Sequence, residues 1–142
     1  MKLVTYLNFS GNCKQAFQFY KEHLGAKIDV MMTFAQMPEP KSVPPGLRED
    51  SVLHASMTLA GTVVMASDGP PERVQPMRSA YLSLSADSTP DAERIHKILS
   101  EGGEVFMPMA ETFFAYRFSM LRDKFGTSWM VIHEKPMGPP SK

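Results

Sequence analysis

The sequence predicts an α+β fold in which two tandem βαβββ modules form a curved mixed sheet around a cavity. The order strand, helix and three strands can be traced twice along the 142 residues. Apolar positions of the two copies correspond, with Leu7 aligning on Leu82 and Phe17 on Ala92. A single helix covers only one face of each module's sheet. Two modules side by side therefore leave a concave face, where small ligands tend to bind.

The first module is expected over residues 1–67. A helix over residues 13–24 places Cys13, Phe17 and Tyr20 on one face, with Asn12 as its N-cap and Gly25 as its left-handed stop. Residues 37–50 hold several prolines and are expected to form a long loop. The expected strands cover residues 3–9, 27–34, 52–59 and 62–67.

A proline-bearing linker over residues 68–79 is expected to lead into the second module, residues 80–135. Ser88 precedes Thr89-Pro90-Asp91, a typical helix start, and Gly102 follows the helix. The expected strands cover residues 80–86, 104–107, 115–121 and 128–134. Residues 136–142 are expected to form a loose tail. The whole chain, residues 1–142, is thus expected to be one domain.

Composition excludes several classes of function. Lys plus Arg and Asp plus Glu are balanced at 15 each, so the chain has no net charge to attract nucleic acid or an anionic membrane. No apolar run reaches the roughly 20 residues that a membrane span needs. The N-terminus resembles a true start without a signal-peptide core, which makes the cytoplasm the expected compartment. The single cysteine, Cys13, rules out an internal disulfide and is expected to be an inert core thiol.

His54 is the polar residue that strand alternation singles out. It shares one strand face with Val52, Ser56 and Thr58, while an apolar set of neighbours occupies the other face, which is expected to pack on the helix. His54 would then point into the cavity, although a structural hydrogen bond to a neighbouring strand is an equal alternative.

Other polar residues have competing interpretations. Asp68 is more typical of a carboxylate that caps a turn than of a residue in a binding or catalytic site. Glu111, just before two aromatic residues, indicates either turn chemistry or an acidic group on the cavity rim. Tyr116 is a strand residue that can also face the cavity. Asp123 and Gly126 indicate a tight hairpin turn, and Trp129 is expected to pack beneath a helix.

Two groups of residues resemble a known family. The stretch from Leu7 to Ala16, followed by Phe19-Tyr20 and Leu24-Gly25, resembles the opening of the glyoxalase/bleomycin-resistance/dioxygenase (vicinal oxygen chelate) superfamily. Glu111-Thr112-Phe113-Phe114 together with Asp123-Lys124-Phe125-Gly126 and Trp129 resembles its PhnB-like branch. The resemblance spans residues 3–135 and implies the fold predicted above.

The resemblance also implies where a divalent metal would sit, on the first and last strands of each module. The matching positions are Thr5, Met65, Tyr81 and Met130, none of which is a histidine or a carboxylate. We therefore expect no metal and no other cofactor. PhnB-like proteins are often described as methyltransferases. This chain, however, has no Gly-x-Gly turn, which a Rossmann-like methyltransferase needs after its first strand.

The leading hypothesis is a metal-free small-molecule-binding protein that forms a homodimer, as members of the family commonly do. Its ligand would contact Thr5, Leu7, His54, Tyr81, Glu111, Tyr116 and Met130. The alternative is an enzyme. It would use a metal through relocated ligands such as His54, Asp68 and Glu111, or acid–base chemistry with His54 and Glu111 as the candidate catalytic residues.

Overall fold

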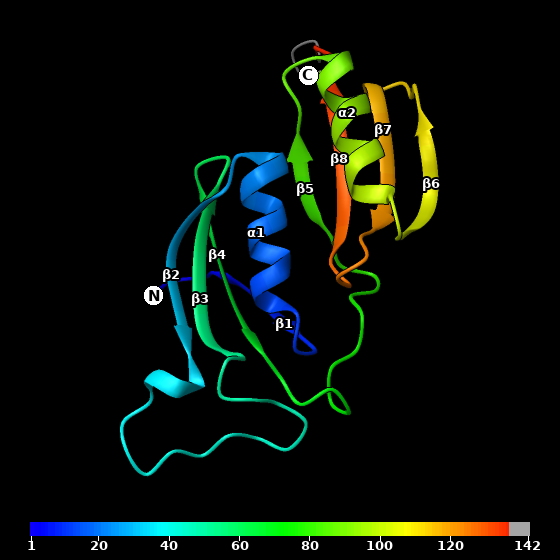
Figure 1. Ribbon diagram of the computed structural model, residues 1–142. Coiled ribbons are helices and arrows are strands. Elements are labelled where there is room, and N and C mark those ends of the chain that lie inside the picture. Colours follow the sequence, from blue (N-terminus) through cyan, green and yellow to red (C-terminus); the bar gives the residue numbers. More distant parts are fainter. Residues whose placement is uncertain (137–142) are drawn as a thin grey trace. The chain divides into compact units, whose positions relative to one another are not determined.

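The computed structural model describes residues 1–136 and divides the chain into two compact units, Met1–Gln75 and Pro76–Lys142 (Figure 1). The boundary lies inside the range 68–79. Each unit contains one long helix on one face of a four-stranded mixed sheet. The repeated order of strand, helix and three strands is therefore confirmed. Of the tail expected at residues 136–142, all but Pro136 lies outside the described residues.

The first unit builds its sheet in the order β1-β4-β3-β2. Its elements are β1 (Thr5–Phe9), α1 (Cys13–Leu24), β2 (Lys27–Thr33), the short 3-10 helix η1 (Phe34–Gln36), β3 (Val52–Leu59) and β4 (Thr62–Asp68). Strand β1 runs parallel to β4, whereas β3 is antiparallel to both β4 and β2. Helix η1 was not predicted, because three residues are too short to show a helical period.

Helix α1 lies where the apolar period predicts it. Its buried residues Cys13, Phe17 and Tyr20 are fully shielded, and Phe17 meets Phe9 of β1 edge to face at 6.3 Å between ring centroids. Gly25 ends the helix at φ 75°, a left-handed conformation that glycine adopts without steric cost.

Asn12 occupies the N-cap position of α1, as predicted, but its side chain does not supply the cap. Instead Oδ1 of Asp68, at the end of β4, accepts hydrogen bonds from the backbone N–H groups of Gly11 (3.0 Å) and Cys13 (2.9 Å). The backbone N–H groups at the start of α1 are therefore paired with a carboxylate at the end of a strand, and not with the side chain of the N-cap residue.

The second unit repeats the arrangement with the strand order β5-β8-β7-β6. Its elements are β5 (Leu82–Ser85), α2 (Thr89–Ser100), β6 (Glu104–Ala110), β7 (Ala115–Arg122) and β8 (Ser128–Glu134). The Ser88 hydroxyl caps α2 by accepting from the Asp91 N–H at 3.2 Å, as predicted. Trp129 and Val131 of β8 are buried, at 1% and 0% exposure, on the face that α2 covers.

Strand limits differ from the prediction mainly at β5 and β6. Strand β5 is shorter than the expected residues 80–86, whereas β6 continues through Pro108 to Ala110. Strand β6 lies at a sheet edge, where a proline's missing N–H can face away from the ladder. No helix within residues 1–136 is long and apolar enough to cross a membrane.

Candidate functional site

Each sheet has one face that its own helix leaves uncovered, and we call these the first and second open faces. In the first unit, Leu7, Ala55 and Ala66 are buried and lie in register on the face toward α1. Adjacent strand residues point to opposite faces. The first open face therefore carries Tyr6, Val30, Met32, His54, Ser56 and Met65, which are connected by the strand register.

A tyrosine and a histidine form the polar centre of the first open face. The Tyr6 hydroxyl lies 3.3 Å from Nδ1 of His54, and the two rings stack at 5.9 Å between centroids. Tyr6 is 51% exposed. Met32 and Met65 are the register partners of His54 and Tyr6. The pair thus combines groups that can donate and accept hydrogen bonds with flexible apolar neighbours.

Thr5 and Leu7 do not share this face, contrary to the expectation from the sequence. Leu7 is 4% exposed and packs in the core on the side of Phe9. Thr5 has the same strand parity and pairs with Val64, which is also buried. Tyr6 stands on the open face beside Met65 instead. A register difference of one residue exchanges the two faces of a strand.

The alternation of apolar and polar residues in β1 indicates which way Tyr6 faces. Leu7 and Phe9 are more apolar than Tyr6 and Asn8, which indicates that the tyrosine faces away from the core. The resemblance to the superfamily's metal position points to Thr5 instead.

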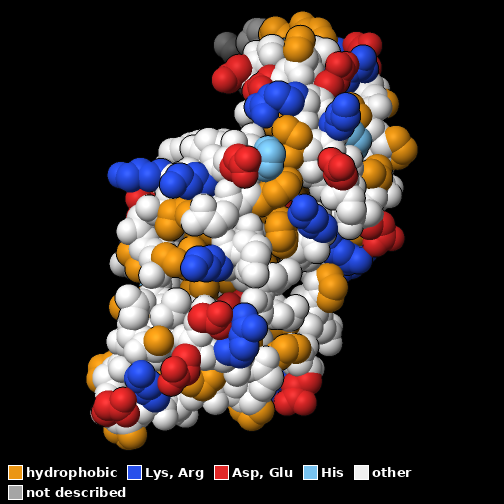
Figure 2. Space-filling model, in the orientation of Figure 1, with side chains coloured by type: hydrophobic (Ala, Val, Ile, Leu, Met, Phe, Trp, Pro, Cys, Tyr) orange, Lys and Arg blue, Asp and Glu red, His pale blue; other side chains and the backbone are white. Residues whose placement is uncertain are grey.

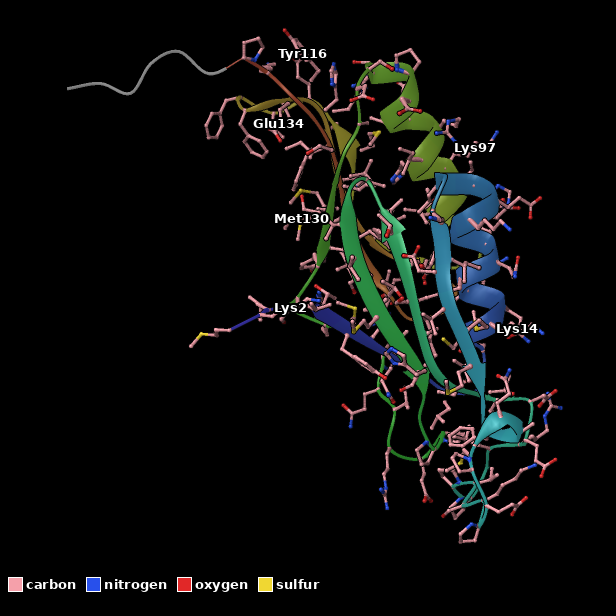
Figure 3. All side chains as sticks on the ribbon, turned by 90° about the vertical axis from the view of Figure 1, so that its left-hand side faces the viewer. Lys2, Lys14, Lys97, Tyr116, Met130 and Glu134 are labelled. Carbon is pink, nitrogen blue, oxygen red and sulfur yellow. The ribbon has the colours of Figure 1, made fainter. Side chains whose placement is uncertain are left out.

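The second open face carries Met130, as predicted. Tyr81 lies on the same face, which follows from the alternation of the residues that lead into β5. Ser83 pairs with Met130, and Leu82 pairs with the buried Trp129, so Tyr81 points away from α2. Figure 3 shows Met130 and Glu134 on the side of this sheet opposite to α2. Other residues of the same parity on this face are Phe118, Met120 and Ile132.

Tyr81 belongs to a cluster that the sequence did not reveal. Nη1 of Arg78 donates to the Tyr81 hydroxyl at 2.9 Å, and the Arg78 guanidinium lies 4.0 Å above the centroid of Phe106. Arg122 approaches the same ring at 5.4 Å, and Tyr81 meets it edge to face at 6.4 Å. Arg78 lies in the expected linker and Phe106 on an edge strand, so no local pattern joins them.

Glu111 and Tyr116 lie elsewhere in the second unit, near Lys135. The Lys135 ammonium contacts Glu111 at 2.6 Å and also donates to the carbonyl oxygen of Thr112 at 2.9 Å. The hydrogen bond and positive charge of Lys135 lower the pKa of Glu111 from its usual value. Tyr116 is 43% exposed and packs on His133, with 5.2 Å between ring centroids. Glu111 is therefore held as an ionised, paired carboxylate.

Asp68 and Cys13 are buried structural groups. Besides its bonds to the start of α1, Asp68 accepts from the Val52 N–H through Oδ2 at 2.8 Å, and it is 6% exposed. Cys13 is fully buried, and this burial raises the pKa of its thiol, with a smaller contribution from the negative charge of Asp68. Neither side chain is presented to a ligand on the open face.

The residues present do not fit the divalent metal that the related superfamily uses. Within residues 1–136, no three His, Cys, Asp or Glu side chains come close enough together to hold a metal ion. The positions matched by resemblance offer a hydroxyl, a phenol and two thioethers, which are poor ligands for a hard divalent ion. The alternative ligands fit no better, because Asp68 is occupied by backbone donors and Glu111 by Lys135.

The described surface shows no concentration of one charge sign on the face drawn in Figure 2, where basic and acidic side chains are interspersed. A shallow pocket of about 220 Å³ is lined by Pro45, Gly46, Pro71 and Glu72. None of the predicted site residues lines it, so it does not add to the two open faces.

Comparisons with known proteins give the chain a family. A family model described as 3-demethylubiquinone-9 3-methyltransferase matches residues 1–132. Protein YjdN of Escherichia coli (strain K12) is 31% identical over 145 residues, covering 96% of this chain and 99% of YjdN.

Solved structures agree with this assignment. Protein PA1353 from Pseudomonas aeruginosa is 38% identical with a TM-score of 0.82, covering 96% of this chain and 99% of PA1353. A PhnB protein from Bacillus cereus, described as a putative 3-demethylubiquinone-9 3-methyltransferase, has a TM-score of 0.79 at 23% identity, over 94% of this chain and 99% of that chain.

A more distant structure has the same fold. The glyoxylase/bleomycin resistance protein/dioxygenase domain from Frankia sp. EAN1pec has a TM-score of 0.64 at 15% identity, over 95% of this chain and 92% of that domain. The match of the family model over residues 1–132 and the likeness to YjdN show that the chain belongs to the PhnB-like family, whose model is described as 3-demethylubiquinone-9 3-methyltransferase, and its repeated βαβββ units have the glyoxalase/bleomycin-resistance fold.

Proposed function

We propose that this chain binds a small molecule on its open sheet faces and needs no resident metal to do so. The observation that carries the proposal is the pair of Tyr6 and His54, whose polar atoms lie 3.3 Å apart on a face that α1 does not cover. A tyrosine with half of its surface exposed beside an imidazole is suited to orient a polar ligand.

The surroundings of this pair favour binding of a partly apolar molecule. Val30 and Met32 of β2 are each 41% exposed beside it. Apolar surface of this kind favours contact with a ligand, and the methionine side chain can adapt its shape. Ser56, which is 7% exposed, adds a hydroxyl to the same face.

We expect His54→Ala to weaken binding of a ligand found by thermal-shift screening, by at least about ten-fold, since one hydrogen bond and one ring contact are lost. Tyr6→Phe should weaken binding of the same ligand while preserving the ring stack. The measurement is the dissociation constant from calorimetry, together with the melting temperature of each variant without ligand.

His23→Ala is the matched control, because this histidine lies in the last turn of α1 and not on the first open face. Equal affinity of the wild type, His54→Ala and Tyr6→Phe for every screened ligand would refute the role of this pair. A His54→Ala protein that melts far below the wild type yet binds normally would make His54 a structural residue.

An enzymatic role for the same pair is the second candidate. A tyrosine hydroxyl within 3.3 Å of an imidazole can exchange a proton with a bound substrate. Conversion of the screened ligand, followed by NMR, separates turnover from binding. We do not propose methyl transfer, because the chain has no Gly-x-Gly turn for the cofactor of a Rossmann-like methyltransferase. The cytoplasmic location expected from the sequence stays a prediction.

We further propose that the protein is a homodimer. Edge strands β2 and β6 expose the apolar side chains of Val30, Met32, Val105 and Met107, which are 41–46% exposed. A second copy that covers such edges removes both apolar surface and unpaired backbone groups from water. Light scattering at micromolar concentration should give twice the chain mass of 15.9 kDa. A mass of one chain would contradict this proposal.

A further inference from the structure

We infer that the second open face contains a binding site for an oxyanion, a carboxylate or phosphoryl group, in which Arg78 and Tyr81 are the donors and Phe106 is the supporting surface. The inference rests on the proposed small-molecule binding and adds the chemical class of the ligand. Its residues all belong to the second unit.

Arg78 carries a positive charge that no described carboxylate neutralises. Arg48, Arg94, Arg117 and Arg122 each pair with a carboxylate. Within residues 1–136, no carboxylate pairs with Arg78, whose side chain is exposed. A guanidinium has five N–H donors, and the described contact with Tyr81 uses one of them. The remaining donors can serve a bound anion.

The Arg78 side chain is also held in position. Its guanidinium rests on Phe106 at 4.0 Å from the ring centroid and is fixed laterally by Tyr81. Arg73 is an exposed arginine that, among residues 1–136, pairs with no carboxylate and lies over no aromatic ring. A preoriented cation loses less side-chain freedom when a ligand binds, and this favours affinity.

The backbone beside Arg78 is also anchored. The N–H of Met77 donates to the carbonyl oxygen of Gly126 at 3.0 Å. The Met77 carbonyl oxygen accepts from Ser128 Oγ at 2.7 Å and from Arg122 Nη1 at 3.3 Å. Ser79 has φ 66°, a left-handed conformation that is uncommon for serine. These contacts fix the segment that joins Arg78 to Tyr81.

The chemistry of the cluster suits an oxyanion. The Tyr81 oxygen accepts from Arg78, so the hydroxyl proton of Tyr81 is available to donate outward. Arg78 and Tyr81 can then donate to the same anionic group through charge-assisted hydrogen bonds. Arg122 adds a second positive charge over Phe106, although its pairing with Glu104 at 3.0 Å offsets part of it. The exposed part of the ring can support an apolar body of the ligand.

The test is an NMR titration of the full chain at constant ionic strength with benzoate, with inorganic phosphate and with neutral benzamide. We expect benzoate or phosphate to shift the resonances of Tyr81 and Phe106, and benzamide to bind at least about ten-fold more weakly than benzoate. Benzoate alone would identify a carboxylate site, whereas phosphate alone would identify a phosphoryl site.

Arg78→Gln should lower the affinity for the anion by at least about ten-fold. Arg78→Lys should lower it by less, because lysine keeps the positive charge but loses the planar guanidinium that can donate two parallel hydrogen bonds. Tyr81→Phe removes the second donor and provides an independent variant if Arg78→Gln is poorly folded. Arg73→Gln is the matched control, since it removes the same charge from an exposed site, and it should leave binding unchanged.

Three results would overturn the inference. The first is that neither anion binds, and the second is that Arg73→Gln weakens binding as much as Arg78→Gln, which would indicate diffuse attraction of charge. The third is that Arg78→Gln still binds the anions with wild-type affinity, while a neutral ligand loses affinity in His54→Ala. That last result would leave the proposed function standing, whereas failure of every ligand to bind would remove both.

Discussion

Asp68→Ala should lower the free energy of unfolding by about 3–5 kcal/mol, because it removes a buried charged acceptor that serves three backbone donors. Oδ1 of Asp68 accepts from Gly11 and Cys13, and Oδ2 accepts from Val52, all within 3.0 Å. With alanine, the start of α1 and the start of β3 both lose their partner in a region that water barely reaches. Urea unfolding followed by circular dichroism gives the change.

Asp50→Ala is the control for Asp68→Ala. Asp50 pairs with Arg48 through an ion pair in which both side chains are largely exposed, at 78% and 69%. Such a pair contributes at most about 1 kcal/mol. If the two variants were equally stable, the carboxylate of Asp68 would not be the cap of α1, and the side chain of Asn12 would have to be reconsidered for that role.

Asp123→Ala should lower the free energy of unfolding by about 2–4 kcal/mol, since Asp123 organises the turn between β7 and β8. Its Oδ1 accepts from the N–H groups of Phe125 (2.9 Å) and Thr127 (3.1 Å), and its Oδ2 accepts from the indole N–H of Trp129 at 2.9 Å. Asp123 is 4% exposed. Unfolding in urea measures the loss.

Trp129 provides a second readout, because it is the single tryptophan of the chain. In Asp123→Ala the indole N–H loses its carboxylate partner, so the native emission of Trp129 should change, whereas Asp87→Ala at an exposed bend should change neither emission nor stability. A double-mutant cycle with Trp129→Phe should give a coupling energy of about 1–3 kcal/mol. Strictly additive effects would show that the bond between Asp123 and Trp129 contributes nothing.

Asp68 and Asp123 are buried structural carboxylates, one in each unit. Each carboxylate accepts hydrogen bonds from groups of its own unit. Asp68 does so at the start of α1, and Asp123 does so at the turn between β7 and β8. The polar groups left on the open faces then differ. The first face has Tyr6 and His54, and the second has Arg78 and Tyr81. Substitutions on an open face should therefore affect binding more than stability.

The sequence by itself determined the local elements of this protein. The apolar period from Cys13 to Leu24 defines α1, and the Ser88 cap with Pro90 starts α2 where it was predicted. The alternation from Val52 to Leu59 placed His54 on the face opposite to Ala55 and Met57, which are fully buried. These features depend on residues within one or two turns or strand steps of each other, and such short-range patterns can be read along the chain.

Only the tertiary structure decided which residues meet. The register of β1 against β4 places Tyr6, not Thr5 or Leu7, on the first open face, because a shift of one residue exchanges the two sides of a strand. The cap of α1 comes from Asp68, which is 55 residues from Cys13. Arg78 and Phe106 meet across the second sheet without any shared pattern. Contacts between distant segments depend on pairing and packing of whole strands, and a periodicity within one segment carries no information about its partner.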